Sequence, residues 1–327
     1  MASLKGFCSV LGLACVWCCG TAAQTNDFYG RLFEGQKLRN SDKFAEALKV
    51  HQALLKDVQK VSGEPRLTAL VFDNVAVDQE DCGNYASAET AFNQGLAVLP
   101  PSSSYSDPVE ANLKVHLSEL YISENRPDDA DGLLRQAREG LRQNSAESLA
   151  LAIVDEDLAV VCIMRHKMIE PEALLRQSQA LIEKQFGPGS TKSVSSLLTY
   201  AGYLIKQHRY DDALDPAEAA WKILSKSPTP LPKPFLASAQ SVRSAVFYHA
   251  GRIPEAEDCA RQAVELAKAS LGPDHPRLGF FLANYAVILK NEGRRSEAKA
   301  IQKEADAIQD RNPAIGAGDT VNIASLR

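Results

Sequence analysis

The stretch GRIPEAEDCARQAVELAKASLGPDHPRLGFFLANYAVILKNEGRRSEA, residues 251–298, decides the fold class. It opens with Gly251-Arg252 and Glu255-Ala256, and the same arrangement returns 42 residues later as Gly293-Arg294 and Glu297-Ala298. Glycine suits the left-handed residue that ends a helix, and an acidic or serine residue then caps the next helix. The stretch therefore predicts a unit of two helices joined by a tight turn, which we call helix A and helix B.

The pair of an acidic residue and alanine recurs along the chain, with Ser87-Ala88 as a variant. Successive alanines are 41, 42, 43, 40, 43 and 42 residues apart. These anchors of helix B are Ala47, Ala88, Ala130, Ala173, Ala213, Ala256 and Ala298. The residue seven positions after the anchor is small in six of the seven units. The residue twelve positions before the anchor is also small in six of the seven units. Small residues on one face of a helix let a neighbouring helix approach closely.

The fourth unit departs from this pattern. Val161 occupies its small position in helix A, and Leu158-Ala159 allows a register shifted by two residues. A single hairpin cannot bury its apolar face alone, so neighbouring units must stack. We therefore expect an all-α, right-handed α-solenoid of about seven repeats over residues 24–311. A chain of 327 residues would otherwise suggest two domains, and the single solenoid replaces that expectation. We expect residues 312–327 to form a C-terminal tail.

The pattern resembles the tetratricopeptide repeat (TPR), in the 42-residue variety of kinesin light chains and related bacterial proteins. The segments that carry the resemblance most clearly are Leu271-Gly272-Pro273-Asp274-His275-Pro276 and Leu282-Ala283-Asn284-Tyr285-Ala286. The resemblance implies that a protein or peptide binds, without catalysis, in a concave groove lined mainly by helix A.

Carrying the family's groove positions over by register gives a set of expected partner-binding residues. These are Arg39, Asp73, Asn74, Glu80, Asn112, Glu119, Lys206, Tyr248, His249, Asn284, Lys290 and Asn291. Asn74 and Asn284 match a recurrent helix-A asparagine, whose amide can hold a peptide backbone through its donor and its acceptor. In the family, lysine and arginine side chains can clamp a ligand's carboxylate, but unit two carries acidic residues where such a clamp would be basic. The resemblance therefore favours a partner whose segment at this end of the array is neutral or basic. Each position taken alone is also compatible with an ordinary packing or exposed residue.

Composition argues against several function classes. The chain has 36 basic and 41 acidic side chains and a net charge of −5, whereas a nucleic-acid binder should carry a basic stripe. The phosphate-loop, dinucleotide, hydrolase-elbow and zinc-protease motifs are missing, so we expect neither an enzyme nor a cofactor or metal.

The run Asp155-Glu156-Asp157 is expected on a solvated or ligand-facing helix surface. Cys82, Cys162 and Cys259 are expected to be isolated small side chains.

Residues 1–23 have the layout of an export signal. Lys5 is the only charge, an apolar run follows from Phe7 to Cys19, and small residues precede a cleavage site after Ala23. The apolar run reaches only about 20 Å, which is short for a bilayer. We expect a periplasmic or extracellular protein with no membrane span in the mature chain. The sequence has no N-x-[ST] sequon, which favours a bacterial envelope over eukaryotic secretion.

Two functions remain open at this point. The first is a non-enzymatic interaction scaffold that binds a peptide or protein in the groove of the repeat array. The alternative is a structural or assembly component of a bacterial cell-envelope or secretion complex. The sequence names neither the partner nor the oligomeric state.

Overall fold

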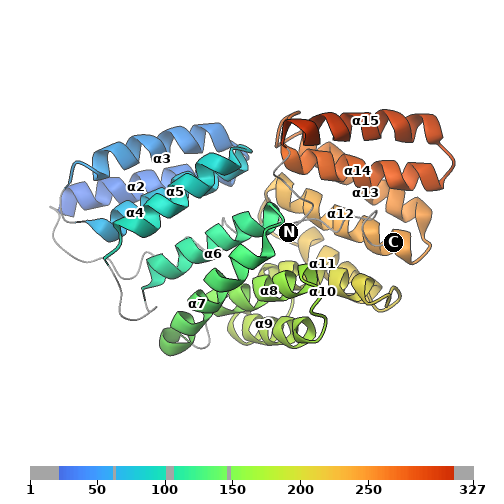
Figure 1. Ribbon diagram of the computed structural model, residues 1–327, viewed down its shortest axis with the longest axis horizontal. Coiled ribbons are helices and arrows are strands. Elements are labelled where there is room, and N and C mark those ends of the chain that lie inside the picture. Colours follow the sequence, from blue (N-terminus) through green and yellow to red (C-terminus); the bar gives the residue numbers. More distant parts are fainter. Residues whose placement is uncertain (1–21, 62–63, 101–106, 146–148, 313–327) are drawn as a thin grey trace. The chain divides into compact units, whose positions relative to one another are not determined.

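The computed structural model describes residues 22–61, 64–100, 107–145 and 149–312 (Figure 1). Within these ranges the chain forms fourteen α-helices and no strand. They are α2 (Ala22–Arg39), α3 (Phe44–Val58), α4 (Pro65–Asp81), α5 (Tyr85–Val98), α6 (Pro108–Ser123), α7 (Pro127–Ser145), α8 (Leu149–Met164), α9 (Glu170–Phe186), α10 (Val194–Lys206), α11 (Leu214–Ser225), α12 (Lys233–His249), α13 (Ile253–Lys268), α14 (Pro276–Asn291) and α15 (Arg295–Arg311). A 3-10 turn, Thr191–Ser193, precedes α10.

The helices alternate as the repeat predicts, with even-numbered helices as helix A and odd-numbered helices as helix B. Each turn from helix A to helix B contains one residue with φ between 57° and 81°, in the left-handed region. These residues are Asp42, Gly83, Asn125, His166, His208, Gly251 and Gly293. The left-handed residue ends each helix A and redirects the chain into helix B. The expected all-α fold of helix–turn–helix repeats is confirmed.

The fourth repeat corrects the expected register. Ala173 is exposed, whereas Pro171, Leu175 and Ser178 are buried on α9. In the first repeat Ala47, His51 and Leu54 are buried at the same relative positions. Pro171 is therefore the true anchor of the fourth repeat, and the anchor spacings on either side of it become 41 and 42 residues.

The same two-residue shift restores the small positions of the fourth repeat. Ala159 on α8 and Ser178 on α9, both fully buried, replace the expected Val161 and Ala180. The left-handed residue His166 precedes Pro171 by five positions, as Gly251 precedes its anchor Ala256. Proline is tolerated at this position because the first turn of a helix leaves its N–H groups without intrahelical partners.

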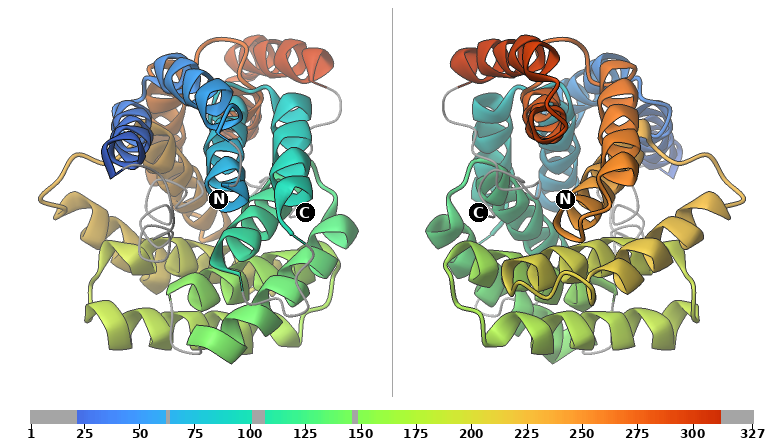
Figure 2. Two further views of the ribbon diagram at one scale, coloured as in Figure 1. Left: turned by 90° about the vertical axis from the view of Figure 1, so that its left-hand side faces the viewer. Right: turned by 90° about the vertical axis from the view of Figure 1, so that its right-hand side faces the viewer.

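The chain divides into two compact units. The described part of the N-terminal unit lies within residues 4–120 and 129–154, and that of the C-terminal unit within residues 121–128 and 155–312. In the N-terminal unit, α2 to α5 lie side by side in chain order (Figures 1 and 2). Its fully buried side chains include Leu54, Phe92 and Leu113. The C-terminal unit has two apolar clusters, one around Leu204 and the other around Phe281.

Two glycines show why the helices need residues with small side chains at these positions. A Cβ on Gly35 would overlap the imidazole ring of His51, which lies across it from α3. A Cβ on Gly95 would lie 2.9 Å from a methyl carbon of Leu113 and 3.1 Å from the Cβ of Phe72. Both contacts are tighter than ordinary packing allows, so these positions set how closely neighbouring helices approach.

The two segments expected to flank the array lie largely beyond the described residues. Of the export signal, only Ala22 and Ala23 are described, as the first residues of α2, and the tail is described only at Asn312. No described helix combines the length and the apolar character that crossing a bilayer requires. Cys82, Cys162 and Cys259 are free thiols.

Candidate functional site

Polar side chains join each helix A to the helix A of a neighbouring repeat. Nδ1 of His116 lies 2.7 Å from Oδ1 of Asp73, between α6 and α4. Asn284 on α14 donates a hydrogen bond of 3.3 Å to Oγ of Ser241 on α12. In each pair the residues are 43 positions apart, one repeat length. We call this set of contacts the helix-A ladder.

The ladder begins with a buried charged network in the first repeats. The guanidinium of Arg39 at the end of α2 donates to Oδ1 of Asp78 at 2.6–2.8 Å and to the carbonyl of Asn74 at 3.2 Å. Burial acts to lower the pKa of Arg39, but the carboxylates of Asp78 and Asp81 raise it above its ordinary value. Nδ1 of His51 lies 2.5 Å from the other oxygen of Asp78. The carboxylate of Asp78 is thus shared between the guanidinium of Arg39 and the imidazole of His51.

Four of the expected partner-binding residues have side chains that already form contacts within this ladder. Arg39, Asp73, Asn74 and Asn284 are each at most 5% exposed. The amide of Asn74 donates to the carbonyl of Leu70 at 2.9 Å and its oxygen faces Arg39. These side chains contact neighbouring helices in the structure, and their role toward a partner stays a prediction.

The acidic run on α8 is not on a solvated surface, contrary to expectation. Asp155, Glu156 and Asp157 are 0%, 4% and 6% exposed. The carboxylate of Glu156 accepts hydrogen bonds from the hydroxyls of Ser195 and Thr199, both on α10. Glu156 therefore joins α8 to α10 and is a further contact of the helix-A ladder. The solvated alternative is wrong because sequence polarity does not reveal a neighbour that supplies hydroxyl donors, and the ligand-facing alternative stays a prediction.

A line of aromatic and imidazole rings crosses the ends of the helices A in the C-terminal unit. The rings of Tyr210 and His249 stack with centroids 5.1 Å apart, and His249 meets Tyr248 edge-on at 5.3 Å. His208 lies beside Tyr210, with Nδ1 2.7 Å from the phenolic oxygen. The Asn291 amide lies 3.5 Å from the Tyr248 hydroxyl. We call these five residues the aromatic cluster; all are exposed or half-buried.

Two lysines end the helices on which this cluster is built. Lys206 is the last residue of α10, and Lys290 lies one residue before the end of α14. Neither has an acidic partner among the described residues. Partial burial lowers the pKa of the Lys206 ammonium group. Cations at helix C-termini are favoured by the helix dipole, and these two remain available to an anion from outside.

The remaining expected residues lie in the N-terminal unit. Glu80 on α4 and Asn112 and Glu119 on α6 are half-buried. Within the C-terminal unit, the structure brings Tyr248, His249 and Asn291 into one cluster. Tyr210 and His208 were missed because they lie in the turn after helix A, beyond the positions that the family register supplies.

The site offers non-covalent binding chemistry. It provides aromatic faces, an amide with both a donor and an acceptor, and two cations. Within the described ranges no three His, Cys, Asp or Glu side chains are grouped so as to hold a metal ion.

Comparison with known proteins finds a partial family match and several solved structures with a similar fold. Residues 235–310, which run from α12 to α15, match the tetratricopeptide repeat family model. A Rap protein solved in complex with competence and sporulation factor is 14% identical, with a TM-score of 0.66 over 88% of this chain and 79% of that chain. A Rap conjugation gene regulator of plasmid pLS20, solved with a Phr peptide, is 13% identical, with a TM-score of 0.63 over 89% of this chain and 76% of that chain.

A third structure, BtubC from P. vanneervenii, is 18% identical, with a TM-score of 0.50 over 71% of this chain and 91% of that chain. None of the curated protein sequences matches the chain. Together with the alternating helices, the family match and the shared fold confirm the expected fold class. The chain therefore has a TPR-like repeat fold, and its residues 235–310 match the tetratricopeptide repeat family model.

Proposed function

We propose that this protein is a non-enzymatic scaffold that holds a protein or peptide partner on the helix-A face of its C-terminal unit. The aromatic cluster carries the proposal, because it places the exposed or half-buried rings of Tyr210, His249 and Tyr248 side by side across two repeats. Two solved neighbours with the same fold are complexes, one with competence and sporulation factor and the other with a Phr peptide, which supports this class of function.

The chemistry of the site suggests what the partner carries. Tyrosine contributes a large apolar face and a hydroxyl, which makes it a frequent energetic centre of protein interfaces. The lysines at the ends of α10 and α14 add two cations without acidic partners among the described residues. We therefore expect a partner segment with an apolar or aromatic side chain next to a carboxylate.

The test is affinity capture with the tagged chain as bait from the organism's own extract. The double variant Lys206→Ala, Tyr248→Ala should bind the captured partner about tenfold or more weakly than the unaltered chain, because it loses a cation and a ring. The control Lys299→Ala, Lys303→Ala removes two exposed lysines from helix B of the last repeat. Equal recovery by all three baits would contradict the proposal.

We also propose that the chain is exported with cleavage after Ala23. The charge and apolar pattern of residues 1–23 supports this. Mass spectrometry of the native protein should find a mature N-terminus at Gln24 in the envelope or medium. A native protein that retains Met1 would overturn the proposal. If the protein instead sediments with a membrane complex, the function as an envelope assembly component is favoured.

A further inference from the structure

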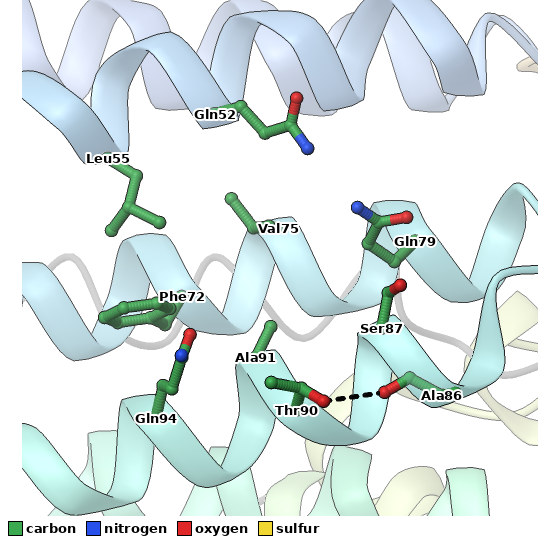
Figure 3. A pocket seen from close by; sticks show the side chains of 10 residues that line it. All are labelled: Gln52, Leu55, Phe72, Val75, Gln79, Ala86, Ser87, Thr90, Ala91 and Gln94. Carbon is green, nitrogen blue, oxygen red and sulfur yellow. Dashed lines mark hydrogen bonds between the residues drawn. The ribbon is translucent and has the colours of Figure 1, made fainter.

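A recess of about 420 Å³ opens between α3 and α5, with α4 as its floor (Figure 3). Phe72 and Val75 of α4 and Leu55 of α3 supply an apolar base. Its size falls within the usual range for ligand sites, which is about 300–1,000 Å³. The recess lies entirely in the N-terminal unit and separates the two helices B of the first two repeats.

The recess lies on a different side of α4 from the helix-A ladder. Phe72, Val75 and Gln79 follow one another at spacings of three and four, so they share one face of the helix. Asp73, which contacts His116 in the next repeat, is about 100° away from Phe72 around the helix. A ligand in the recess would therefore leave the helix-A contacts unchanged.

The walls of the recess carry polar groups but no charge. None of its ten lining residues is acidic or basic. Gln52 of α3 and Gln94 of α5 are exposed, and neither amide has a hydrogen-bond partner among the described residues. Gln79 accepts a 3.0 Å hydrogen bond from Asn84 and keeps its own N–H₂ group available. Figure 3 shows the amides of Gln52 on α3 and Gln79 on α4 both pointing toward the recess.

These features select one kind of occupant. A charged group would lose hydration here without an ion to replace it, so the complementary ligand is uncharged. An amide side chain offers one acceptor and two donors, which matches the alternating C=O and N–H groups of an extended peptide. From Phe72 to Gln79 the floor is about 10 Å long at about 1.5 Å per residue. That length accommodates three extended residues at about 3.3 Å each.

We infer that this recess is a second peptide-binding site, which holds about three extended, uncharged residues of a partner polypeptide. An apolar side chain of the segment rests on Phe72 and Val75, and the amides of Gln52 and Gln94 hydrogen-bond its backbone. The site is independent of the aromatic cluster, so the protein can hold two segments at once.

The test is selection of phage-displayed random heptapeptides on the whole chain. The selected peptides should share a run of uncharged residues with a central aliphatic or aromatic side chain. As synthetic capped peptides they should bind about tenfold more weakly to Gln52→Ala, Gln94→Ala, which lacks both available amides. They should also bind more weakly to Val75→Glu or Gln94→Glu, because either change places a charge in the recess.

Two controls make the outcome decisive. Gln59→Ala removes an exposed glutamine just after α3 that does not line the recess, and it should leave peptide affinity unchanged. The Lys206→Ala, Tyr248→Ala variant should also bind these peptides normally, which separates this site from the proposed helix-A function. Selection of charged sequences, failure of any peptide to be enriched, or equal affinity for the Gln52→Ala, Gln94→Ala variant would each overturn the inference.

Discussion

At the scale of single residues, the close approach of α2 and α3 depends on a glycine. Gly35 faces the fully buried ring of His51, and any Cβ at this position would overlap that ring. We expect Gly35→Ala to destabilise the chain by about 1–3 kcal/mol, the usual cost of overpacking. Urea unfolding followed by circular dichroism measures this directly.

Gly30 provides the matched control on the same helix. A Cβ there meets nothing within 4 Å, and alanine is a better helix former than glycine by about 0.5–1 kcal/mol. Gly30→Ala should therefore be neutral or stabilising. If both substitutions shift the unfolding midpoint equally, the packing of His51 against Gly35 is not what limits this position.

The contact between the first and second repeats depends most on Asp78. This residue is fully buried and faces both Arg39 and His51. Asp78→Asn keeps the shape but leaves the buried guanidinium of Arg39 without the carboxylate that it contacts most closely, which should cost about 3–5 kcal/mol. Asp81, whose side chain is 24% exposed, is only 3.6 Å from Arg39, and Asp81→Asn should cost clearly less. Comparable losses for the two variants in urea unfolding would refute this ranking.

The thiol of Cys82 should respond to pH in a predictable direction. Burial, with the nearby carboxylates of Asp81 and Asp78, raises its pKa from 9.0 to about 11. The raised value means that the folded state favours the neutral thiol. The resulting contribution to stability is complete below about pH 9 and is lost as the pH rises toward 11. Alkylation of Cys82 in the folded chain, followed by peptide mass spectrometry, should accelerate near pH 11.

The same experiment contains its own reference. In urea the thiol is free of these neighbours, and its alkylation should accelerate near pH 9. Asp81→Asn should move the folded-state midpoint downward, because it removes one carboxylate that opposes thiolate formation. A folded-state midpoint at or below that of the unfolded chain would contradict the assignment.

At the scale of elements, the sequence predicts the helices well because the anchor positions recur at a nearly constant spacing. The error lies in the fourth repeat, where the expected anchor Ala173, of the pair Glu172-Ala173, lies two residues after the true anchor Pro171. The pair is a weak signal, since alanine suits any helix position. Two stronger signals were present, Ala159 at the small position of helix A and His166 as the left-handed residue.

The corrected register makes a sharp prediction on α9. Ala173 is exposed, so Ala173→Glu should change stability by less than about 0.5 kcal/mol. Ser178 is fully buried, so Ser178→Glu should destabilise by several kcal/mol because it buries a charge without an ion partner. Thermal unfolding of the two variants distinguishes the registers. A larger loss for Ala173→Glu would restore the original alignment.

At the scale of the whole molecule, the repeat class was predictable and the details of the site were only partly so. Register alone places residues on helix A, and three of those it selected, Tyr248, His249 and Asn291, lie together in the structure, while their role toward a partner stays a prediction. The register could not show that the side chains of Arg39 and Asn284 form hydrogen bonds within the protein, because their partners Asp78 and Ser241 lie one repeat away in the sequence. Pairs of polar residues about 39–43 positions apart are the signal that would have revealed the helix-A ladder.

The most direct test of the proposed function is site-specific photo-crosslinking with a benzoyl-phenylalanine side chain. Placed at position 248 in the aromatic cluster, the probe should crosslink a protein or peptide partner in the native extract, and the yield should fall when Lys206 is replaced by alanine. Placed at position 303 on helix B, the probe should give no such product. A partner that crosslinks from position 303 but not from position 248 would contradict the account.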